Sequence, residues 1–183
     1  MLVTFEGIDG CGKSTLARKV CESISGDVLL THEPTRELTS SDPVALALLF
    51  AADRAEHTSE LKRFLERGDI LCDRYCDSTS AFQGVMISRA HNVDIDEVFE
   101  YLAEVHMPFI IPPDKTFYID ISVEKAQKRK KELEVGFLGD VREAYLRMIE
   151  KDPLNRESRF IQLDGEETIE KLSQQVLEYL KPV

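Results

Sequence analysis

Residues 7–14 read Gly7-Ile8-Asp9-Gly10-Cys11-Gly12-Lys13-Ser14 and fit the phosphate-binding pattern G-x-x-x-x-G-K-[ST]. The apolar stretch Leu2-Val3-Thr4-Phe5 precedes them, and a helix-like stretch from Lys13 to Ile24 follows. In this strand–loop–helix context, backbone N–H groups surround phosphate oxygens and the helix N-terminus adds partial positive charge. Lys13 would reach the β- and γ-phosphates, and the Ser14 hydroxyl would hold Mg²⁺. The segment therefore predicts a nucleotide-binding loop.

Length and composition are those of a single globular domain. The chain has 183 residues, of which 43% are hydrophobic and 31% charged, so we expect one domain over residues 1–183. No apolar run reaches the ~20 residues that span a bilayer. The chain leads straight into its first strand, and its four cysteines lack the spacing of a disulfide framework or a complete metal site. We therefore expect a cytoplasmic protein without membrane contacts. The net charge of −11 argues against nucleic-acid binding, which requires a basic surface.

Apolar and amphipathic segments alternate along the whole chain. The pattern predicts strands at residues 2–6, 28–31, 70–72, 116–119 and 160–163. It predicts helices at residues 13–25, 43–50, 54–67, 78–89, 95–106, 123–133, 138–151 and 167–180. Strands that alternate with helices of this length form a parallel sheet with helices on both faces. We therefore predict an α/β, three-layer fold of the P-loop NTPase type, with about five parallel strands.

Further site candidates follow the second and third predicted strands. Ligands of such sheets bind beyond the carboxyl ends of the strands, where residues 32–36 and 73–75 join the loop. Asp73 could act on the Mg²⁺ shell, and Arg74 could hold a transferring phosphate, because the planar guanidinium binds phosphate with two hydrogen bonds. Three other arginines have plausible reach, although any one of them, taken without its neighbours, is more readily explained as a solvated surface residue. They are Arg36, Arg54 and Arg129.

Four segments, in this order, resemble the thymidylate kinase family. They are Phe5-Glu6-Gly7-Ile8-Asp9-Gly10-Cys11-Gly12-Lys13-Ser14-Thr15, Glu33-Pro34-Thr35, Leu49-Phe50-Ala51-Ala52-Asp53-Arg54-Ala55-Glu56, and Asp73-Arg74-Tyr75-x₂-Ser78-Thr79-Ser80-Ala81-Phe82-Gln83-Gly84. The last is the most specific, because an Asp-Arg-aromatic unit precedes a Ser/Thr-rich Ala-aromatic-Gln-Gly unit. The resemblance covers essentially the whole chain and implies an ATP-dependent nucleoside monophosphate kinase.

The resemblance also implies roles for matching positions. ATP would bind to Gly7, Ile8, Asp9, Gly10, Cys11, Gly12, Lys13, Ser14 and Thr15. The cofactor would be Mg²⁺, with Ser14 and Asp73 as its residues. The dTMP residues would be Arg74 and Arg36 at the phosphate, Asp9 at the deoxyribose 3′-hydroxyl, and Phe50, Arg54, Ser80 and Gln83 at the base. Phe50 could otherwise be a core residue, and Ser80 and Gln83 could be polar residues of a helix surface.

The chain departs from the family pattern in the groups that would meet the transferring phosphate. His32 stands where many relatives have arginine, and Leu138 stands where some relatives have glutamine. The loop has Gly10 and Cys11 in place of an arginine, and relatives of that type supply basic residues from a lid. The lid here, about residues 128–137, is shortened. Its basic residues are Lys128, Arg129, Lys130 and Lys131. Arg129 is the candidate for the catalytic cation, unless these residues form the solvated face of a helix.

The predicted reaction is transfer of the γ-phosphoryl group of Mg-ATP to dTMP, giving dTDP and ADP in dTTP synthesis. The catalytic residues would be Lys13, Arg74, Asp9 and Arg129. Two alternatives remain open: a kinase for another (deoxy)nucleoside monophosphate or a deoxynucleoside, and a regulatory P-loop ATPase. Relatives are homodimers, and the apolar run Val44–Phe50 permits one, although a buried core helix explains that run equally well.

Overall fold

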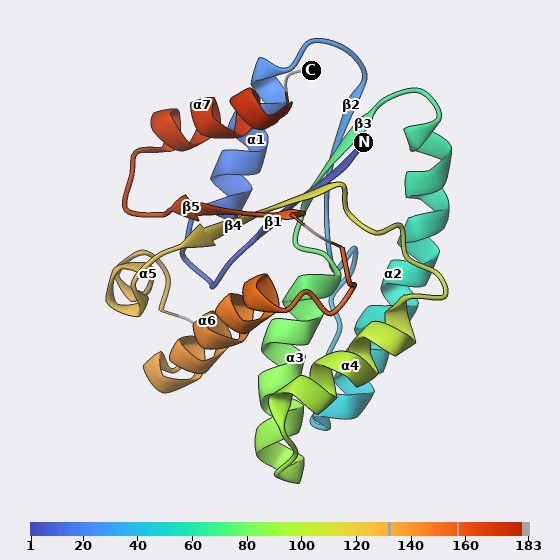
Figure 1. Cartoon of the computed structure of the whole chain (residues 1–183), viewed down its shortest axis with the longest axis vertical. Helices are drawn as coiled ribbons and strands as arrows, with labels where there is room; N and C mark the ends of the chain where they lie inside the picture. The colour runs from blue at the N-terminus through green and yellow to red at the C-terminus, as the bar shows by residue number, and fades with distance from the viewer. Residues whose placement is uncertain (132, 157, 181–183) are drawn as a thin grey trace.

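Five parallel strands form one sheet in the order β2-β3-β1-β4-β5 in the computed structural model, which describes residues 1–131, 133–156 and 158–180 (Figure 1). The strands are β1 (Leu2–Glu6), β2 (Val28–His32), β3 (Asp69–Asp73), β4 (Lys115–Asp120) and β5 (Phe160–Asp164). Every neighbouring pair is parallel. The predicted parallel sheet is confirmed.

Helices cover both faces of this sheet. They are α1 (Lys13–Ser23), α2 (Pro43–Leu65), α3 (Cys76–His91), α4 (Ile95–His106), α5 (Val123–Arg129), α6 (Val135–Glu150) and α7 (Ile169–Leu180). Figure 1 shows α1 and α7 on one face and α3, α4 and α6 on the other, and α2 packs against α3. The predicted three-layer α/β architecture is thus confirmed. None of the described helices is long and apolar enough to cross a membrane.

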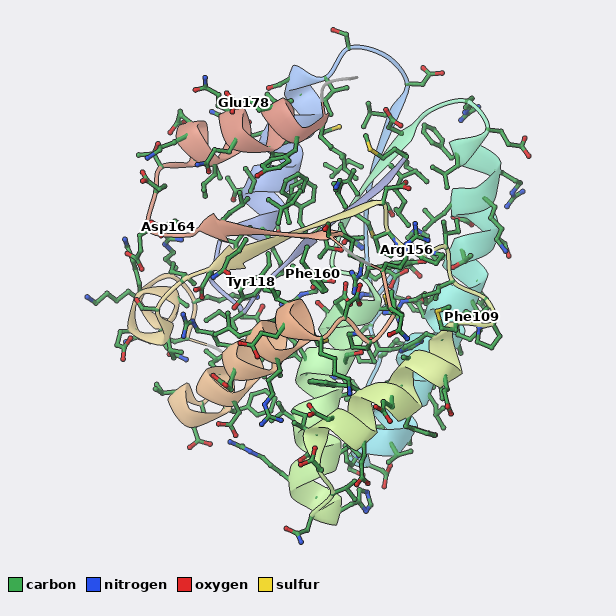
Figure 2. The ribbon with its side chains drawn as sticks, in the orientation of Figure 1. Phe109, Tyr118, Arg156, Phe160, Asp164 and Glu178 are labelled. Carbon is green, nitrogen blue, oxygen red and sulfur yellow. The ribbon has the colours of Figure 1, made fainter. Side chains whose placement is uncertain are left out.

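The central strand explains the position of the core. All five residues of β1 are buried, because β3 and β4 flank it and helices cover both of its faces. Figure 2 shows side chains filling the space between the sheet and both helix layers. Tyr118 of β4, for example, packs on Tyr145 of α6 with ring centroids 5.0 Å apart. The four cysteines are free thiols.

The structure corrects two helix boundaries in the first half. The helices predicted at residues 43–50 and 54–67 form one continuous helix, α2. The intervening residues include no glycine or proline. The carboxylate of Asp53, which lies in the helix, accepts from the backbone N–H and the hydroxyl of Thr35, outside the helix, at 2.7 and 2.6 Å. Asp42 caps the start of α2 by accepting from the N–H of Ala45 at 2.8 Å. The helix ends at Leu65, two residues before the predicted end at residue 67.

The structure also shortens the predicted lid. The helix expected over residues 123–133 ends at Arg129, and the one expected from residue 138 begins at Val135. Residues 128–129 and 135–137 of the expected lid segment, 128–137, therefore belong to the ends of α5 and α6. Residue 132, within both the predicted helix and the predicted lid, lies outside the described residues.

Candidate active site

The predicted nucleotide-binding loop joins β1 to α1 at the carboxyl edge of the sheet. Its glycines have positive φ, and two of them leave no room for a side chain. A Cβ on Gly10 (φ +86°) would lie 2.4 Å from the carbonyl oxygen of Ala126, and one on Gly7 (φ +146°) 2.9 Å from that of Ile119. The loop therefore packs directly on the end of β4 and on α5, which fixes its backbone N–H groups.

A cavity of about 370 Å³ opens over this loop. Its lining residues are Asp9, Gly10, Gly12, Lys13, Ser14, Thr15, Asp73, Arg74, Arg129 and Lys130. Lys13 is 6% exposed, and burial and the charge of Arg74 lower the pKa of its ammonium group. Because positive groups and loop N–H groups converge here, the cavity fits a polyanion.

Arg129 is brought to the loop, as the lid hypothesis requires. Its Nη1 donates to the carbonyl oxygens of Gly10 and Cys11 at 3.4 and 3.3 Å. The next residue, Lys130, has its Nζ 3.7 Å from Oδ1 of Asp9. The end of α5, at Arg129 and Lys130, therefore presents two cations to the phosphate cavity.

The oxygen atoms of Ser14 and Asp73 fit a magnesium ion. Both residues line the phosphate cavity, and Oδ1 of Asp73 is a buried oxygen without a hydrogen-bond partner among the described residues. A buried carboxylate oxygen is normally paired, so a partner from outside the chain is expected here. Mg²⁺ prefers hard oxygen ligands and keeps most of its water, so one or two protein oxygens suffice.

A second cavity, of about 190 Å³, adjoins the first and shares Asp9 and Arg74 with it. Its other lining residues are Glu33, Pro34, Phe50, Arg54, Tyr75, Ser78, Thr79, Phe82 and Gln83. Aromatic rings and a few polar groups therefore stand beside the phosphate site, which is the composition of a pocket for a planar, polar ligand.

Arg74 and Asp9 stand where the two cavities meet. Nη2 of Arg74 donates to Oδ1 of Asp9 at 2.8 Å, Nη1 donates to Oγ of Ser78 at 2.9 Å, and the guanidinium lies 4.7 Å from the ring centroid of Phe82. Partial burial would raise the pKa of Asp9, but the charges of Arg74, Lys13 and Lys130 outweigh it and lower that pKa. Asp9 is thus an anionic hydrogen-bond acceptor held among cations.

Arg54 lies at the back of the second cavity and is 1% exposed. Its Nε donates to Oε2 of Glu33 at 2.6 Å, Nη2 donates to Oγ1 of Thr79 at 3.0 Å, and Nη1 lies 3.3 Å from a ring nitrogen of His106. Burial and the charge of Arg54 lower the pKa of His106 to about 3, so its imidazole is neutral and can accept from Nη1. Two of the five guanidinium N–H groups remain without a partner among the described residues, on a side chain that lines the second cavity.

Two of the predicted acceptor residues are not brought into the second cavity. Arg36 is half exposed and pairs with Asp53 and Glu56, and Ser80 is buried outside the lining. Lining residues that the sequence did not predict are Ser78, Thr79 and Phe82, whereas Tyr75 lies in the candidate stretch 73–75. Their signal was the helical repeat, because positions 78, 79, 82 and 83 share one face of α3 and position 80 lies on another.

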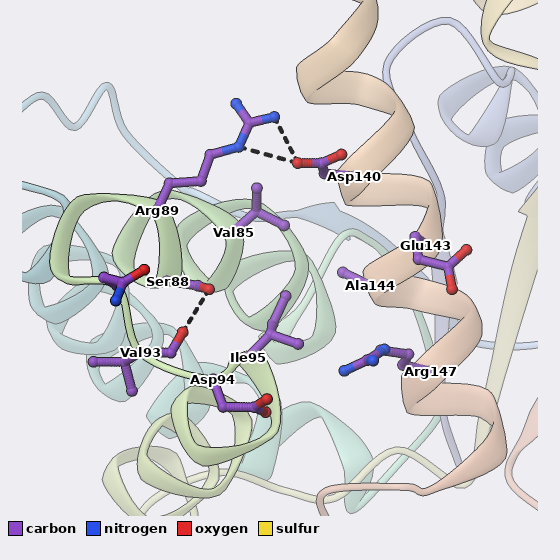
Figure 3. Close-up of a pocket in the computed structure, with 11 residues that line it drawn as sticks. Val85, Ser88, Arg89, Val93, Asp94, Ile95, Asp140, Glu143, Ala144 and Arg147 are labelled. Carbon is purple, nitrogen blue, oxygen red and sulfur yellow. Dashed lines mark hydrogen bonds and ion pairs between the residues drawn. The ribbon is translucent and has the colours of Figure 1, made fainter.

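A larger groove, of about 620 Å³, lies between α3, the start of α4 and α6 (Figure 3). Two of its charged side chains pair with each other, since Arg89 donates to Asp140 at 2.5 Å, and the hydroxyl of Ser88 donates to the carbonyl of Val93 at 2.7 Å. It contains none of the predicted site residues. The chemistry therefore belongs to the two cavities at the edge of the sheet.

The site defines a class of protein. A glycine-rich loop lies at the end of the central strand, and the cavity over this loop shares an arginine and an aspartate with a second cavity beside it. A polyphosphate donor and a smaller phosphorylated acceptor can lie side by side there, which is the arrangement of P-loop kinases that phosphorylate nucleotides.

Comparisons with known proteins place the chain within that class. The family model described as thymidylate kinase matches residues 5–176. The chain is 38% identical to a protein of Sulfurisphaera tokodaii, over 97% of this chain and 94% of the relative. It is 35% identical to one of Methanosarcina mazei over 100% and 98%, and 34% identical to one of Halorubrum lacusprofundi over 98% and 97%. Each relative is named a probable thymidylate kinase. The chain belongs to the thymidylate kinase family and is an ATP-dependent nucleoside monophosphate kinase.

Proposed function

We propose that this kinase transfers the γ-phosphoryl group of Mg-ATP to the phosphate of dTMP, giving ADP and dTDP. The observation that carries the proposal is the pair of adjoining cavities, with Arg74 and Asp9 at their junction. The family match over residues 5–176 supports both the acceptor and a single kinase domain over residues 1–183.

The donor would lie in the loop cavity. The backbone of residues 7–15 surrounds its phosphates, Lys13 reaches the β- and γ-phosphates, and Ser14 and Asp73 hold Mg²⁺. The metal ion neutralises charge on the phosphates when bound. Arg129 stands over the same cavity, 3.3 Å from the carbonyl oxygen of Cys11, and is the candidate cation for the charge that develops during transfer.

The acceptor would lie in the second cavity, with its phosphate at the junction. Arg74 binds that phosphate, and Asp9 accepts from the 3′-hydroxyl of the deoxyribose. Phe50 stacks on the thymine, while Arg54 and Gln83 face its polar edge. Because the acceptor phosphate is already an anion, the reaction needs no strong base. Alignment of two anionic groups and neutralisation of their charge supply the catalysis.

An acceptor panel tests the proposal. Purified protein is given Mg-ATP with dTMP, dUMP, dCMP, thymidine or no acceptor, and products are separated by chromatography. We expect dTDP formation with dTMP to exceed every other transfer. Preferred phosphorylation of thymidine would identify a deoxynucleoside kinase, and ADP release that ignores the acceptor would identify an ATPase.

The variant Arg74→Ala tests the role of the junction. It should lower dTMP-dependent turnover by ~10³-fold or more, because the acceptor phosphate loses its charged partner, while ATP binding survives. Arg63→Ala is the matched control, since Arg63 is an exposed arginine of α2 outside both cavities. Near-normal dTDP formation by Arg74→Ala would contradict the assignment.

We further propose that the enzyme is a cytoplasmic homodimer. Leu48 and Leu49 of α2 are 45% and 40% exposed, which supports a contact between copies through this helix. The free thiols of all four cysteines support a reducing compartment. Gel filtration with light scattering tests the dimer, and we expect Leu48→Glu to yield monomers.

A further inference from the structure

Glu6 is a buried carboxylate that the reaction outlined above does not use. It is the last residue of β1, immediately before the nucleotide-binding loop, and it is 0% exposed. Three groups donate to it: the backbone N–H of Tyr75 to Oε1 at 2.7 Å, and the hydroxyls of Ser78 and Tyr145 to Oε2 at 2.5 and 2.8 Å. A carboxylate is retained in the interior only with such partners. The three donors therefore hold Glu6 in a fixed place and orientation.

Two of these contacts constrain Arg74. The backbone of Arg74 has φ +67°, in the left-handed region that residues with a side chain avoid. The next N–H, that of Tyr75, is the one that Glu6 accepts. The guanidinium of Arg74 donates to Oγ of Ser78 at 2.9 Å, and the Ser78 hydroxyl in turn donates a hydrogen bond to Glu6. One carboxylate thus anchors both the backbone and the side chain of the arginine.

The surrounding elements reinforce this arrangement. Tyr145 of α6 donates to Glu6, and its hydroxyl is 3.0 Å from Oγ of Ser78. Asp9 accepts from the opposite edge of the Arg74 guanidinium at 2.8 Å. Arg74 is therefore held from both edges, with its position set by β1, α3 and α6 together.

We propose that Glu6 is a positioning residue for acceptor binding: its carboxylate fixes the backbone and guanidinium of Arg74 in the orientation that receives the phosphate of the nucleoside monophosphate. The inference rests on the proposed function, in which Arg74 is the ligand of that phosphate. Glu6 itself touches no substrate, since it lines neither cavity.

Glu6→Gln separates positioning from packing, because the amide has nearly the same shape. Its oxygen can still accept from Tyr75, but its NH₂ group faces Ser78 and Tyr145 as a donor. The Ser78 hydroxyl then loses its carboxylate acceptor and can donate to the Tyr145 hydroxyl instead, 3.0 Å away. The link from Glu6 through Ser78 to Arg74 is broken while the volume of the side chain is kept.

A double-mutant cycle tests the proposal by calorimetric titration of dTMP and, separately, ATP into wild type, Glu6→Gln, Arg74→Ala and the double variant. We expect Glu6→Gln to raise the Kd for dTMP about tenfold, or ~1.4 kcal/mol, and to leave the Kd for ATP unchanged. In the Arg74→Ala background, Glu6→Gln should have no further effect, because the residue that it positions is gone. Tyr118→Phe is the control: Tyr118 lies beside Glu6 in the sheet register, and its hydroxyl bonds to Asp120 instead.

Tyr145→Phe repeats the test without altering the charge of the core. It removes one donor to Glu6 and no atom that lines either cavity. It should weaken dTMP binding about threefold in the wild-type background and not at all beside Arg74→Ala. This variant decides the question if Glu6→Gln does not fold.

The outcomes distinguish the inference from the function on which it rests. A wild-type protein that does not bind dTMP would contradict the proposed function, and the inference with it. A wild-type protein that binds dTMP, with Glu6→Gln and Tyr145→Phe binding it equally well, would overturn the inference alone. If Glu6→Gln or Tyr145→Phe raised the Kd for dTMP by the same factor with and without Arg74→Ala, the inference would also be overturned, since these residues would then have a general structural role.

Discussion

Replacement of Arg54 by methionine tests whether the arginine behind the acceptor cavity holds the fold as well as the ligand. Arg54 is 1% exposed, and the side chain of its partner Glu33 is 2% exposed. Arg54→Met leaves the Glu33 carboxylate buried, with the ring of His57, 2.9 Å away, as its remaining side-chain partner among the described residues. Removal of one member of a buried ion pair typically destabilises a protein by ~3–5 kcal/mol.

Because His57 remains, we expect Arg54→Met to lie at the lower end of this range. A loss of about 3 kcal/mol is a large fraction of a typical stability of about 5–15 kcal/mol. For a chain of this length it corresponds to a decrease in Tm of about 6–12 °C. Urea unfolding at pH 7, followed by circular dichroism, measures the change in the free energy of unfolding.

The double variant Glu33→Gln/Arg54→Met shows where the loss comes from. It removes both charges, so it should be about 1–2 kcal/mol more stable than Arg54→Met alone. Arg63→Met is the matched control: Arg63 lies on the same helix but is exposed, and its replacement should change stability by less than about 0.5 kcal/mol. A loss below about 1 kcal/mol for Arg54→Met, or a double variant no more stable than the single, would refute the reasoning.

Three further predictions follow from the same geometry. Lys13→Ala should abolish phosphoryl transfer, because the loop loses the cation that reaches the donor phosphates; retained ADP formation in a coupled assay would show that the loop is only structural. Arg129→Ala should lower kcat by ~10²-fold or more, while Lys131→Ala, at an exposed position, leaves it unchanged; equal kcat values would move the catalytic role to Lys130. Burial and the charge of Asp77 raise the pKa of Glu6 from 4.5 to about 7. Between these values the folded state keeps a proton that the unfolded chain releases. The stability that Glu6 contributes below pH 4.5 is therefore lost as the pH rises through 7. Relative to Glu6→Gln, the free energy of unfolding of the wild type should fall by up to about 3 kcal/mol between these pH values. If urea unfolding gave the same difference between the two proteins at about pH 4.5 and about pH 7.5, this expectation would be contradicted.

The sheet could be predicted because its signals are local. Every predicted strand lies within one residue of the observed ends, from β1 to β5. Strands covered on both faces appear as short apolar runs, and the glycines of the loop mark where β1 stops. Helix limits were less accurate. Asp53 interrupts the apolar pattern of α2, yet Thr35, far away in sequence, satisfies its carboxylate and lets the helix continue.

The arginines of the site show which information a sequence motif lacks. Arg36 and Arg54 were predicted by the same resemblance, but their environments differ completely. Arg36 is half exposed and pairs with two acidic residues of α2, the buried Asp53 and the exposed Glu56. Arg54 is enclosed by Glu33, Thr79 and His106, which come from three other segments of the chain. A motif identifies the residue type that binds phosphate or a base edge, whereas the pairing of distant segments decides which arginine is held rigidly and which can move. Because only a rigid guanidinium offers the same N–H groups to every ligand, base recognition should depend more on Glu33 and His106 than the motif alone indicates.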